Sequence, residues 1–340
     1  MIKVFIIDDS ILIRNIIHKI LKDSRTIEII GESPNPIDAM KEFKRTGLPD
    51  VFILDIEMPK MDGLSFLKKI QDEKPIPTLI FSSLVNEGSS KAMEALECGA
   101  CDILLKPQRL NNALTNDFTE DFITKVKAAA HSKYINNVVH STSINSNRKG
   151  NSKKIIGIGA STGGVQTIES ILSNLHPFHP PIVITQHMPA GFTYSFANRL
   201  NKSCENSTIK EAEEGDVLES GSVYIAPGDL HLEVHLNENK RYICVLKNYP
   251  KVSNHKPSVD VLFKSMSKMV KSNTVAFLLT GMGRDGAHGL QLIKDVGGTT
   301  YGQNEESSIV YGMPKIAFEQ GSVQKQVNIS DVVTLINEME

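Results

Sequence analysis

The sequence predicts two α/β domains, each built around a parallel β-sheet. In the first 131 residues, four short apolar runs alternate with amphipathic helical segments, which is the pattern of a parallel α/β fold. These runs lie at residues 2–7, 51–54, 78–81 and 102–105. A second series of apolar runs begins after a polar stretch rich in serine and asparagine. We therefore expect domains at 1–131 and 153–340, joined by a linker at 132–152.

Polar side chains follow each strand expected in the first domain. They are Asp8, Asp9, Asp55, Ser82 and Lys106. The carboxyl ends of parallel strands meet at one edge of a sheet, so the three carboxylates should lie close together. Crowded carboxylates repel one another unless a hard divalent cation such as Mg²⁺ lies between them. Asp55 is then placed to act as a nucleophile toward a phosphoryl group, with Lys106 offsetting negative charge and Ser82 offering a hydroxyl.

In the second domain, the first apolar run ends at a serine. Residues 154–159 have the pattern of a buried strand, and Ala160-Ser161-Thr162-Gly163-Gly164 follows them. A helical pattern begins immediately afterwards, so Ser161 should lie on a tight turn between a strand and a helix. The backbone N–H groups at such a helix start can hold a developing oxyanion.

A serine hydroxyl becomes a nucleophile when a base takes its proton. His187 is the expected base because it follows the apolar run 181–186, and Asp285 is the expected orienting carboxylate because it follows the run 275–280. All three side chains would then stand at one rim of the sheet. The chain order Ser, His, Asp differs from that of the α/β-hydrolases, so the pattern predicts a separate, convergent triad.

Residues 207–247 show a different pattern within the second domain. Short alternating runs are separated by turns at Gly215-Asp216 and Asn237-Glu238-Asn239. Alternation and short turns are typical of antiparallel strands. We therefore expect an antiparallel hairpin region appended to the parallel sheet.

The glycines before Ser161 also resemble part of a dinucleotide-binding fingerprint. Gly157 and Gly159 fit its first two positions, but Thr162 occupies the third. The next strand ends in Gln186, without a carboxylate to hold a ribose hydroxyl. A nucleotide-dependent oxidoreductase is therefore disfavoured.

Two other groups of residues receive structural interpretations. Cys98-Gly99-Ala100-Cys101 is formally a C-x-x-C motif, but Cys98 should close a helix, where the negative end of the dipole disfavours a thiolate. His231 and His235 alternate along an expected strand and are interpreted as packing or surface residues. His288 is interpreted as a solvated residue at a helix start, with a weaker alternative as part of the pocket near Asp285.

Composition excludes several classes of protein. A net charge of −2 and a pI near 6.6 give no electrostatic footprint for nucleic acid. No stretch is long and apolar enough for membrane insertion. The first apolar run stops at acidic residues without a small-residue cleavage site, so it is expected to be a strand and not a signal peptide. We therefore expect a cytoplasmic enzyme.

These motifs resemble those of two known families. Residues 1 to about 125 resemble a response-regulator receiver domain through Asp8-Asp9, Asp55-Ile56-Glu57-Met58-Pro59, Ser82 and Lys106-Pro107. Residues 153–340 resemble the catalytic domain of the chemotaxis protein-glutamate methylesterases, the CheB family. The motifs of that second resemblance are Gly159-Ala160-Ser161-Thr162-Gly163-Gly164, Gln186-His187-Met188-Pro189, Ala226-Pro227-Gly228 and Gly281-Met282-Gly283-Arg284-Asp285-Gly286. The resemblance implies two doubly wound domains, an N-terminal flavodoxin-like receiver and a C-terminal parallel-sheet esterase domain.

For the second domain, the resemblance implies hydrolysis of glutamate γ-methyl esters on methyl-accepting chemotaxis receptors, with release of methanol. It also implies deamidation of certain receptor glutamines. Ser161 would attack the carbonyl carbon, and backbone N–H groups near Thr162 and Met282 would hold the oxyanion. No cofactor is expected at this site.

For the first domain, the resemblance implies phosphorylation of Asp55 by a chemotaxis histidine kinase. Mg²⁺ would be held by Asp8, Asp9, Asp55 and the backbone of Glu57, and phosphorylation would relieve a block of the esterase. Ile103 stands where receivers commonly have an aromatic residue that reorients on phosphorylation, which leaves that relay open.

Two alternatives fit the same domain plan. A phosphorylation-controlled binding module without catalysis is disfavoured by the intact Ser161, His187 and Asp285. A DNA-binding response regulator would need a basic recognition helix after the linker, whereas the linker leads into a strand.

Overall fold

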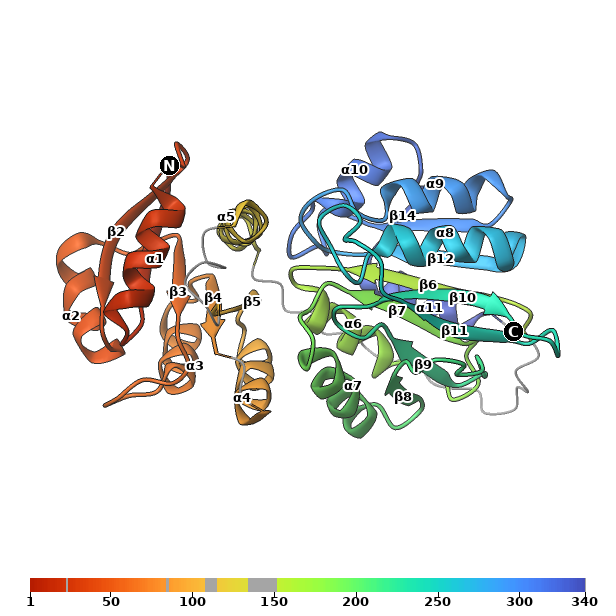
Figure 1. Ribbon diagram of the computed structural model, residues 1–340, viewed down its shortest axis with the longest axis horizontal. Coiled ribbons are helices and arrows are strands. Elements are labelled where there is room, and N and C mark those ends of the chain that lie inside the picture. Colours follow the sequence, from red (N-terminus) through yellow and green to blue (C-terminus); the bar gives the residue numbers. More distant parts are fainter. Residues whose placement is uncertain (23, 84–85, 108–114, 134–151, 340) are drawn as a thin grey trace. The chain divides into compact units, whose positions relative to one another are not determined.

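The computed structural model describes residues 1–22, 24–83, 86–107, 115–133 and 152–339 (Figure 1). The chain divides into two compact units, Met1–Tyr134 and Ile135–Glu340. Most of the linker predicted at 132–152 lies outside the described residues. No helix in the described ranges is both long enough and apolar enough to cross a membrane.

The first unit contains a five-stranded sheet in the order β2-β1-β3-β4-β5, and every strand pair is parallel. This order is that of the flavodoxin-like doubly wound fold, so the predicted fold class is confirmed. The strands are β1 (Ile2–Ile7), β2 (Ile27–Ser33), β3 (Val51–Leu54), β4 (Thr78–Ser82) and β5 (Asp102–Leu105). The helices are α1 (Ile11–Leu21), α2 (Pro36–Thr46), α3 (Gly63–Glu73), α4 (Asn86–Glu97) and α5 (Asn116–Ala130).

Local sequence explains where several of these helices begin. Four of them start with an N-cap side chain that accepts a hydrogen bond from a backbone N–H in the first turn. These caps are Ser10, Asn35, Asp62 and Thr115. The four predicted strands are present, and β2 is an additional edge strand. Its exposed Glu28 and half-buried middle hide the continuous apolar signal that marks the central strands.

The second unit contains a seven-stranded parallel sheet in the order β14-β13-β12-β6-β7-β9-β8. Its strands are β6 (Ile155–Ala160), β7 (Ile182–Gln186), β8 (Thr208–Glu211), β9 (Ser222–Ile225), β12 (Thr274–Leu278), β13 (Thr299–Gln303) and β14 (Lys325–Val327). Its helices are α6 (Gly164–Leu172), α7 (Phe192–Ser203), α8 (Val259–Met269), α9 (Ala287–Asp295), α10 (Met313–Glu319) and α11 (Ile329–Asn337), with a short 3₁₀ turn, η2 (Lys271–Asn273).

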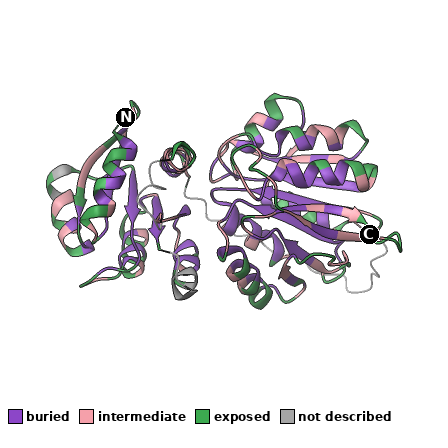
Figure 2. Ribbon diagram, in the orientation of Figure 1, coloured by how far each residue is buried: buried purple, intermediate pink, exposed green. Residues whose placement is uncertain are grey.

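Helices cover both faces of this sheet. Figure 1 shows α8, α9 and α10 over one face and α6 and α7 over the other. The central strands are buried along their length in both units, whereas the outer sides of the helices are exposed (Figure 2). Such two-sided burial explains why the central strands are continuous apolar runs in the sequence.

The strand order changes direction between β6 and β12, which lie side by side. From β6 the chain proceeds to β7 on one side, and from β12 it proceeds to β13 on the other. In open α/β sheets, ligands bind at the carboxyl ends of the strands beside such a switch point. Ser161 follows β6 and Asp285 follows β12, so the topology brings both to this crevice.

The antiparallel hairpin predicted within 207–247 is present as β10 (His231–Leu236) and β11 (Tyr242–Lys247). It packs against α8 as a separate two-stranded sheet. The other strands of that stretch, β8 and β9, differ from the prediction because they pair in parallel at the edge of the main sheet. The segment between them does not make a simple hairpin, since Val217 pairs with Ile243 of β11 before the chain returns to β9.

Candidate active site and acidic cluster

The turn that carries Ser161 is fixed by its backbone. The Ser161 N–H donates to Thr280 O (3.0 Å), and the Ser161 carbonyl accepts from Gly164 N (2.7 Å) and Gln186 Nε2 (2.9 Å). Gly163 has a φ of +79°, a left-handed conformation that glycine adopts without steric cost. These contacts hold the serine between the ends of β7 and β12, as the strand-end argument predicts.

His187 and Asp285 form a buried pair. His187 Nε2 lies 2.8 Å from Asp285 Oδ2, and their side chains are only 4% and 1% exposed. The carboxylate of Asp285 also accepts hydrogen bonds from the Ser258 hydroxyl and from the backbone N–H groups of Val259, Asp260 and Gly286. Asp285 therefore orients the histidine and also caps the start of α8.

The surroundings of Asp285 favour its ionised form. Burial by itself raises the pKa of this carboxyl, but the hydrogen bond and charge interaction with His187, together with His255, outweigh that effect. The pKa of Asp285 is therefore lowered from its ordinary value. An ionised carboxylate can both hold the imidazole and stabilise an imidazolium.

The other ring nitrogen of His187 is available for chemistry. His187 Nδ1 is buried and has no hydrogen-bond partner among the described residues. The His187 backbone N–H donates to Ala160 O (3.0 Å), next to the serine. Because Nε2 is held by Asp285, Nδ1 is the nitrogen that can take the Ser161 proton. No hydrogen bond joins Ser161 and His187 side chains in the described structure, and such contacts often tighten when substrate binds.

Close packing brings the loop after β12 against the nucleophile turn. A Cβ on Gly281 would come within 2.6 Å of Ser161 Cβ, so only glycine permits this approach. The next residue, Met282, has a backbone N–H with no acceptor in the described part of the chain. The Thr162 carbonyl accepts from Thr280 Oγ1 (3.0 Å), which joins the same two loops. Both predicted oxyanion donors thus belong to loops that touch Ser161.

One histidine at the site was missed by the sequence analysis. The ring of His255 stacks on the ring of His187, with centroids 3.6 Å apart and planes inclined by 12°. His255 lies in the polar loop between β11 and α8 and does not follow a strand of the parallel sheet, so the strand-end argument does not reach it. No periodicity or motif in the sequence marks it, so only the fold reveals its place.

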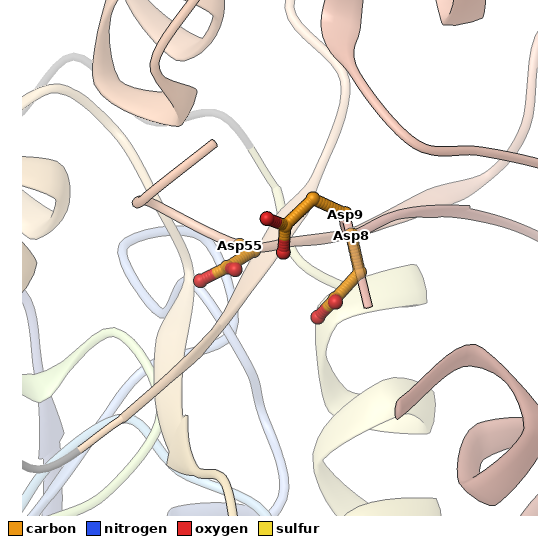
Figure 3. A group of neighbouring side chains, drawn as sticks. All are labelled: Asp8, Asp9 and Asp55. Atoms are coloured by element: carbon orange, nitrogen blue, oxygen red, sulfur yellow. The ribbon is translucent and has the colours of Figure 1, made fainter. Parts of the chain in front are cut away.

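In the first unit, the predicted acidic residues come together at the ends of β1 and β3. Asp8, Asp9 and Asp55 each offer a carboxylate oxygen, and these oxygens lie within 4.8 Å of one another (Figure 3). Asp8 and Asp55 are buried, whereas Asp9 is exposed. Lys106 Nζ lies 2.6 Å from Asp55 Oδ2 and 2.8 Å from Asp8 Oδ2.

Burial dominates the electrostatics of this cluster. It raises the pKa of Asp55 to about 6, although the Lys106 ammonium opposes the shift. Burial also raises the pKa of Asp8, again against Lys106. Buried carboxylate oxygens that lack enough positive charge match what a hard cation requires, so this donor set fits Mg²⁺.

Three further predicted positions adjoin the cluster. Ser82 is buried at the end of β4, and its carbonyl accepts from Lys106 N (2.7 Å). The Glu57 side chain is exposed and pairs with Lys91 (3.4 Å), which leaves its backbone as the possible metal ligand. Ile103 is buried in β5.

The residues interpreted as structural have structural surroundings. His231 is buried and stacks on Tyr249, His235 pairs with Glu233, and His288 is exposed in the first turn of α9. Burial raises the pKa of the thiols of Cys98 and Cys101, which disfavours the reactive thiolate.

Comparison with known proteins identifies both regions. A family described as CheB methylesterase matches residues 156–336, and one described as response regulator receiver domain matches residues 4–116. The chain belongs to the CheB methylesterase family. The resemblance inferred from the sequence motifs is therefore confirmed.

Relatives in the CheB family match nearly the whole chain. A protein-glutamate methylesterase/protein-glutamine glutaminase 3 of Leptospira interrogans is 44% identical, with 98% of each chain covered. A protein-glutamate methylesterase/protein-glutamine glutaminase of Thiobacillus denitrificans is 42% identical over 95% of this chain and 92% of its own. The crystal structure of the Thermotoga maritima CheB methylesterase catalytic domain superposes with a TM-score of 0.53 at 39% identity, covering 55% of this chain and 98% of that one.

Proposed function

We propose that this protein hydrolyses glutamate γ-methyl esters on methyl-accepting chemotaxis receptors, under the control of phosphorylation at Asp55. The observation that carries the proposal is the buried pair of His187 and Asp285 beside the Ser161 turn, at the switch point of the parallel sheet. Membership of the CheB family supplies the substrate class.

The acylation step uses each member of the triad. Ser161 Oγ attacks the ester carbonyl carbon while its proton passes to His187 Nδ1. Asp285 stabilises the imidazolium, and the N–H groups of Thr162 and Met282 donate to the oxyanion. Collapse of the tetrahedral intermediate breaks the bond to the methoxy oxygen, which takes the proton from His187 and leaves as methanol.

The deacylation step regenerates the serine. Water attacks the acyl carbon and gives a proton to His187, and Ser161 leaves with that proton restored. The product is a glutamate side chain. With a glutamine side chain as substrate, the same steps release ammonia, so deamidation needs no additional residue.

The acidic cluster supplies the regulatory input. Asp55 accepts a phosphoryl group from a chemotaxis histidine kinase, and Asp8, Asp9, Asp55 and the Glu57 carbonyl would hold Mg²⁺. When bound there, the ion would supply positive charge beside the transferred oxygens. Lys106 and Ser82 stand at the neighbouring strand ends, where an ammonium and a hydroxyl can bind those oxygens. Because the proposed substrates are the cytoplasmic parts of receptors, we expect this activity in the cytoplasm.

The test uses methylated and glutamine-containing cytoplasmic fragments of chemotaxis receptors. We expect wild-type protein to release methanol from the first and ammonia from the second, faster with Mg²⁺ and a small phosphodonor. Asp55→Asn should keep the basal rate and lose the stimulation. Failure of phosphorylated protein to release either product would favour a non-catalytic binding module.

A further inference from the structure

His255 lies against the catalytic histidine but belongs to a separate turn. Its ring covers one face of the His187 imidazole at 3.6 Å, nearly parallel to it. A near-parallel stack at this distance is van der Waals contact over the whole ring. His255 therefore restricts how the His187 ring can tilt.

The turn that presents His255 is well defined. Val252 and His255 exchange backbone hydrogen bonds of 3.1 and 2.9 Å, and the two residues between them have left-handed φ values, 53° at Ser253 and 67° at Asn254. This is the geometry of a tight two-residue hairpin turn. A turn closed in this way holds its fourth residue in one place.

The same turn is joined to the start of α8, which holds Asp285. The Ser253 hydroxyl donates to Asp260 Oδ2 (3.4 Å), and the Asp260 backbone N–H donates to Asp285 Oδ1 (3.1 Å). Asp285, which binds the edge of the His187 ring, and the turn of His255, which covers the ring face, are thus both hydrogen-bonded to Asp260.

The hydrogen bond to Asp285 does not by itself fix the direction of His187 Nδ1. It holds one ring nitrogen, and the ring can still rotate about the χ2 torsion, whose energy well is broad for histidine. Proton transfer needs Nδ1 within hydrogen-bond reach of the serine hydroxyl. Contact on the ring face provides the missing constraint.

We propose that His255 is a positioning residue, whose stacked ring holds the His187 imidazole in the plane that presents Nδ1 to Ser161. The inference rests on the proposed Ser-His-Asp mechanism and adds a fourth side chain to it.

A substitution series at His255 separates positioning from other roles. In the phosphodonor-activated full chain, His255→Ala should lower kcat about tenfold with little change in KM, since a small misplacement of a catalytic group is costly. His255→Phe keeps an aromatic ring on His187 and should restore most of kcat, whereas His255→Leu should restore less. His235→Ala, which removes a histidine from the β10–β11 hairpin, should behave as wild type.

A second readout does not depend on turnover. The proton in the hydrogen bond between His187 and Asp285 should give a downfield NMR resonance, assigned by its loss in His187→Gln. We expect the resonance to broaden in His255→Ala, where the ring is freer to rotate, and to sharpen again in His255→Phe.

Several outcomes would overturn the inference. They are a wild-type kcat in His255→Ala, a rise in KM alone, which would indicate a substrate contact, and equal rates for the Phe and Ala variants. If instead His187→Gln retained turnover, the proposed mechanism itself would be wrong. The two failures are therefore distinguishable in one set of assays.

Discussion

The carboxylate of Asp285 accepts a hydrogen bond from His187 Nε2 at 2.8 Å while it also caps the start of α8. In the proposed mechanism, stability and catalysis therefore depend on the same side chain. Backbone N–H groups at the helix start hold the carboxylate in place, and the carboxylate in turn binds His187 Nε2, so that Nδ1 is left as the nitrogen that can accept a proton. Perturbing Asp285 should thus affect folding and rate together, and perturbing Ser161 should affect rate alone.

Asp285→Asn tests this double role. The amide favours the wrong imidazole tautomer, so kcat should fall by about 10⁴-fold. In the wild-type protein the carboxylate accepts hydrogen bonds from His187 and four other donors. Each donor that the variant leaves without an acceptor lowers the free energy of unfolding by about 1–3 kcal/mol. Methanol release and urea unfolding measure the two effects. Asp331→Asn, at the capping box of α11, should reduce stability without lowering kcat; an equal loss of kcat there would contradict the assignment.

The lowered pKa of Asp285 gives its contribution a direction with pH. The unfolded carboxyl binds a proton near its ordinary pKa of 3.8, and the folded carboxyl binds one only at lower pH. Its stabilising contribution is therefore complete above that value and is lost as the solution is acidified below it.

Mg²⁺ binding should depend on pH near 6, at higher pH than the range in which Asp285 takes up its proton. Burial raises the pKa of Asp55 from 3.8 to about 6, so between these values the folded protein holds a proton that the unfolded chain has lost. The contribution of Asp55 to the free energy of unfolding therefore falls as pH rises between these two values. Mg²⁺ competes with this proton for Asp55. The rise in the thermal unfolding midpoint that Mg²⁺ causes should therefore become larger as pH rises through about 6. Asp55→Asn should reduce this increase, and a midpoint shift independent of pH would contradict the cluster as the metal site.

Lys106→Ala removes the ammonium that lies 2.6 Å from Asp55 and 2.8 Å from Asp8. Breaking a buried ion pair by removing one partner costs about 3–5 kcal/mol. We expect that loss at neutral pH without Mg²⁺ and partial recovery with it. Chemical unfolding at several Mg²⁺ concentrations measures both. Lys41→Ala, which removes an exposed partner of Asp38, should lower the free energy of unfolding far less. Equal losses in the two variants would show that the buried ion pair stabilises the protein no more than the exposed one.

Gly281→Ala tests the packing that brings the β12 loop to the nucleophile. The added Cβ would lie 2.6 Å from Ser161 Cβ and 2.5 Å from Met313 Sδ, so the loop has to move away. We expect about 1–3 kcal/mol of destabilisation and a lower kcat, because Met282 shifts with it. Gly215→Ala adds a methyl group in open space at another glycine with positive φ and should keep kcat. A normal kcat in Gly281→Ala would remove Met282 from the oxyanion site.

Strand ends were the part of the site that the sequence could predict. Ser161, His187 and Asp285 follow central strands, whose burial on both faces produces apolar runs that are easy to recognise. The same reasoning placed Asp55 and Lys106. In a parallel sheet, position in the sequence then implies position in space.

Elements without that burial escaped prediction. β2 is an edge strand with a half-exposed middle, and β8 pairs in parallel where alternation indicated a hairpin. His255 reaches the site from a polar turn, and its stack on His187 depends on how that turn docks near α8. Such tertiary placement leaves no periodic trace in the sequence.

Methanol release by wild-type protein and Ser161→Ala, with methylated receptor fragments, Mg²⁺ and a phosphodonor, tests the central claim most directly. The hydrogen bonds that hold the Ser161 turn are made by its backbone, so the variant should fold as wild type. The account predicts rapid release by wild type and a rate at least about 1,000-fold lower for the variant. Comparable release by the two proteins would contradict a serine nucleophile at this site.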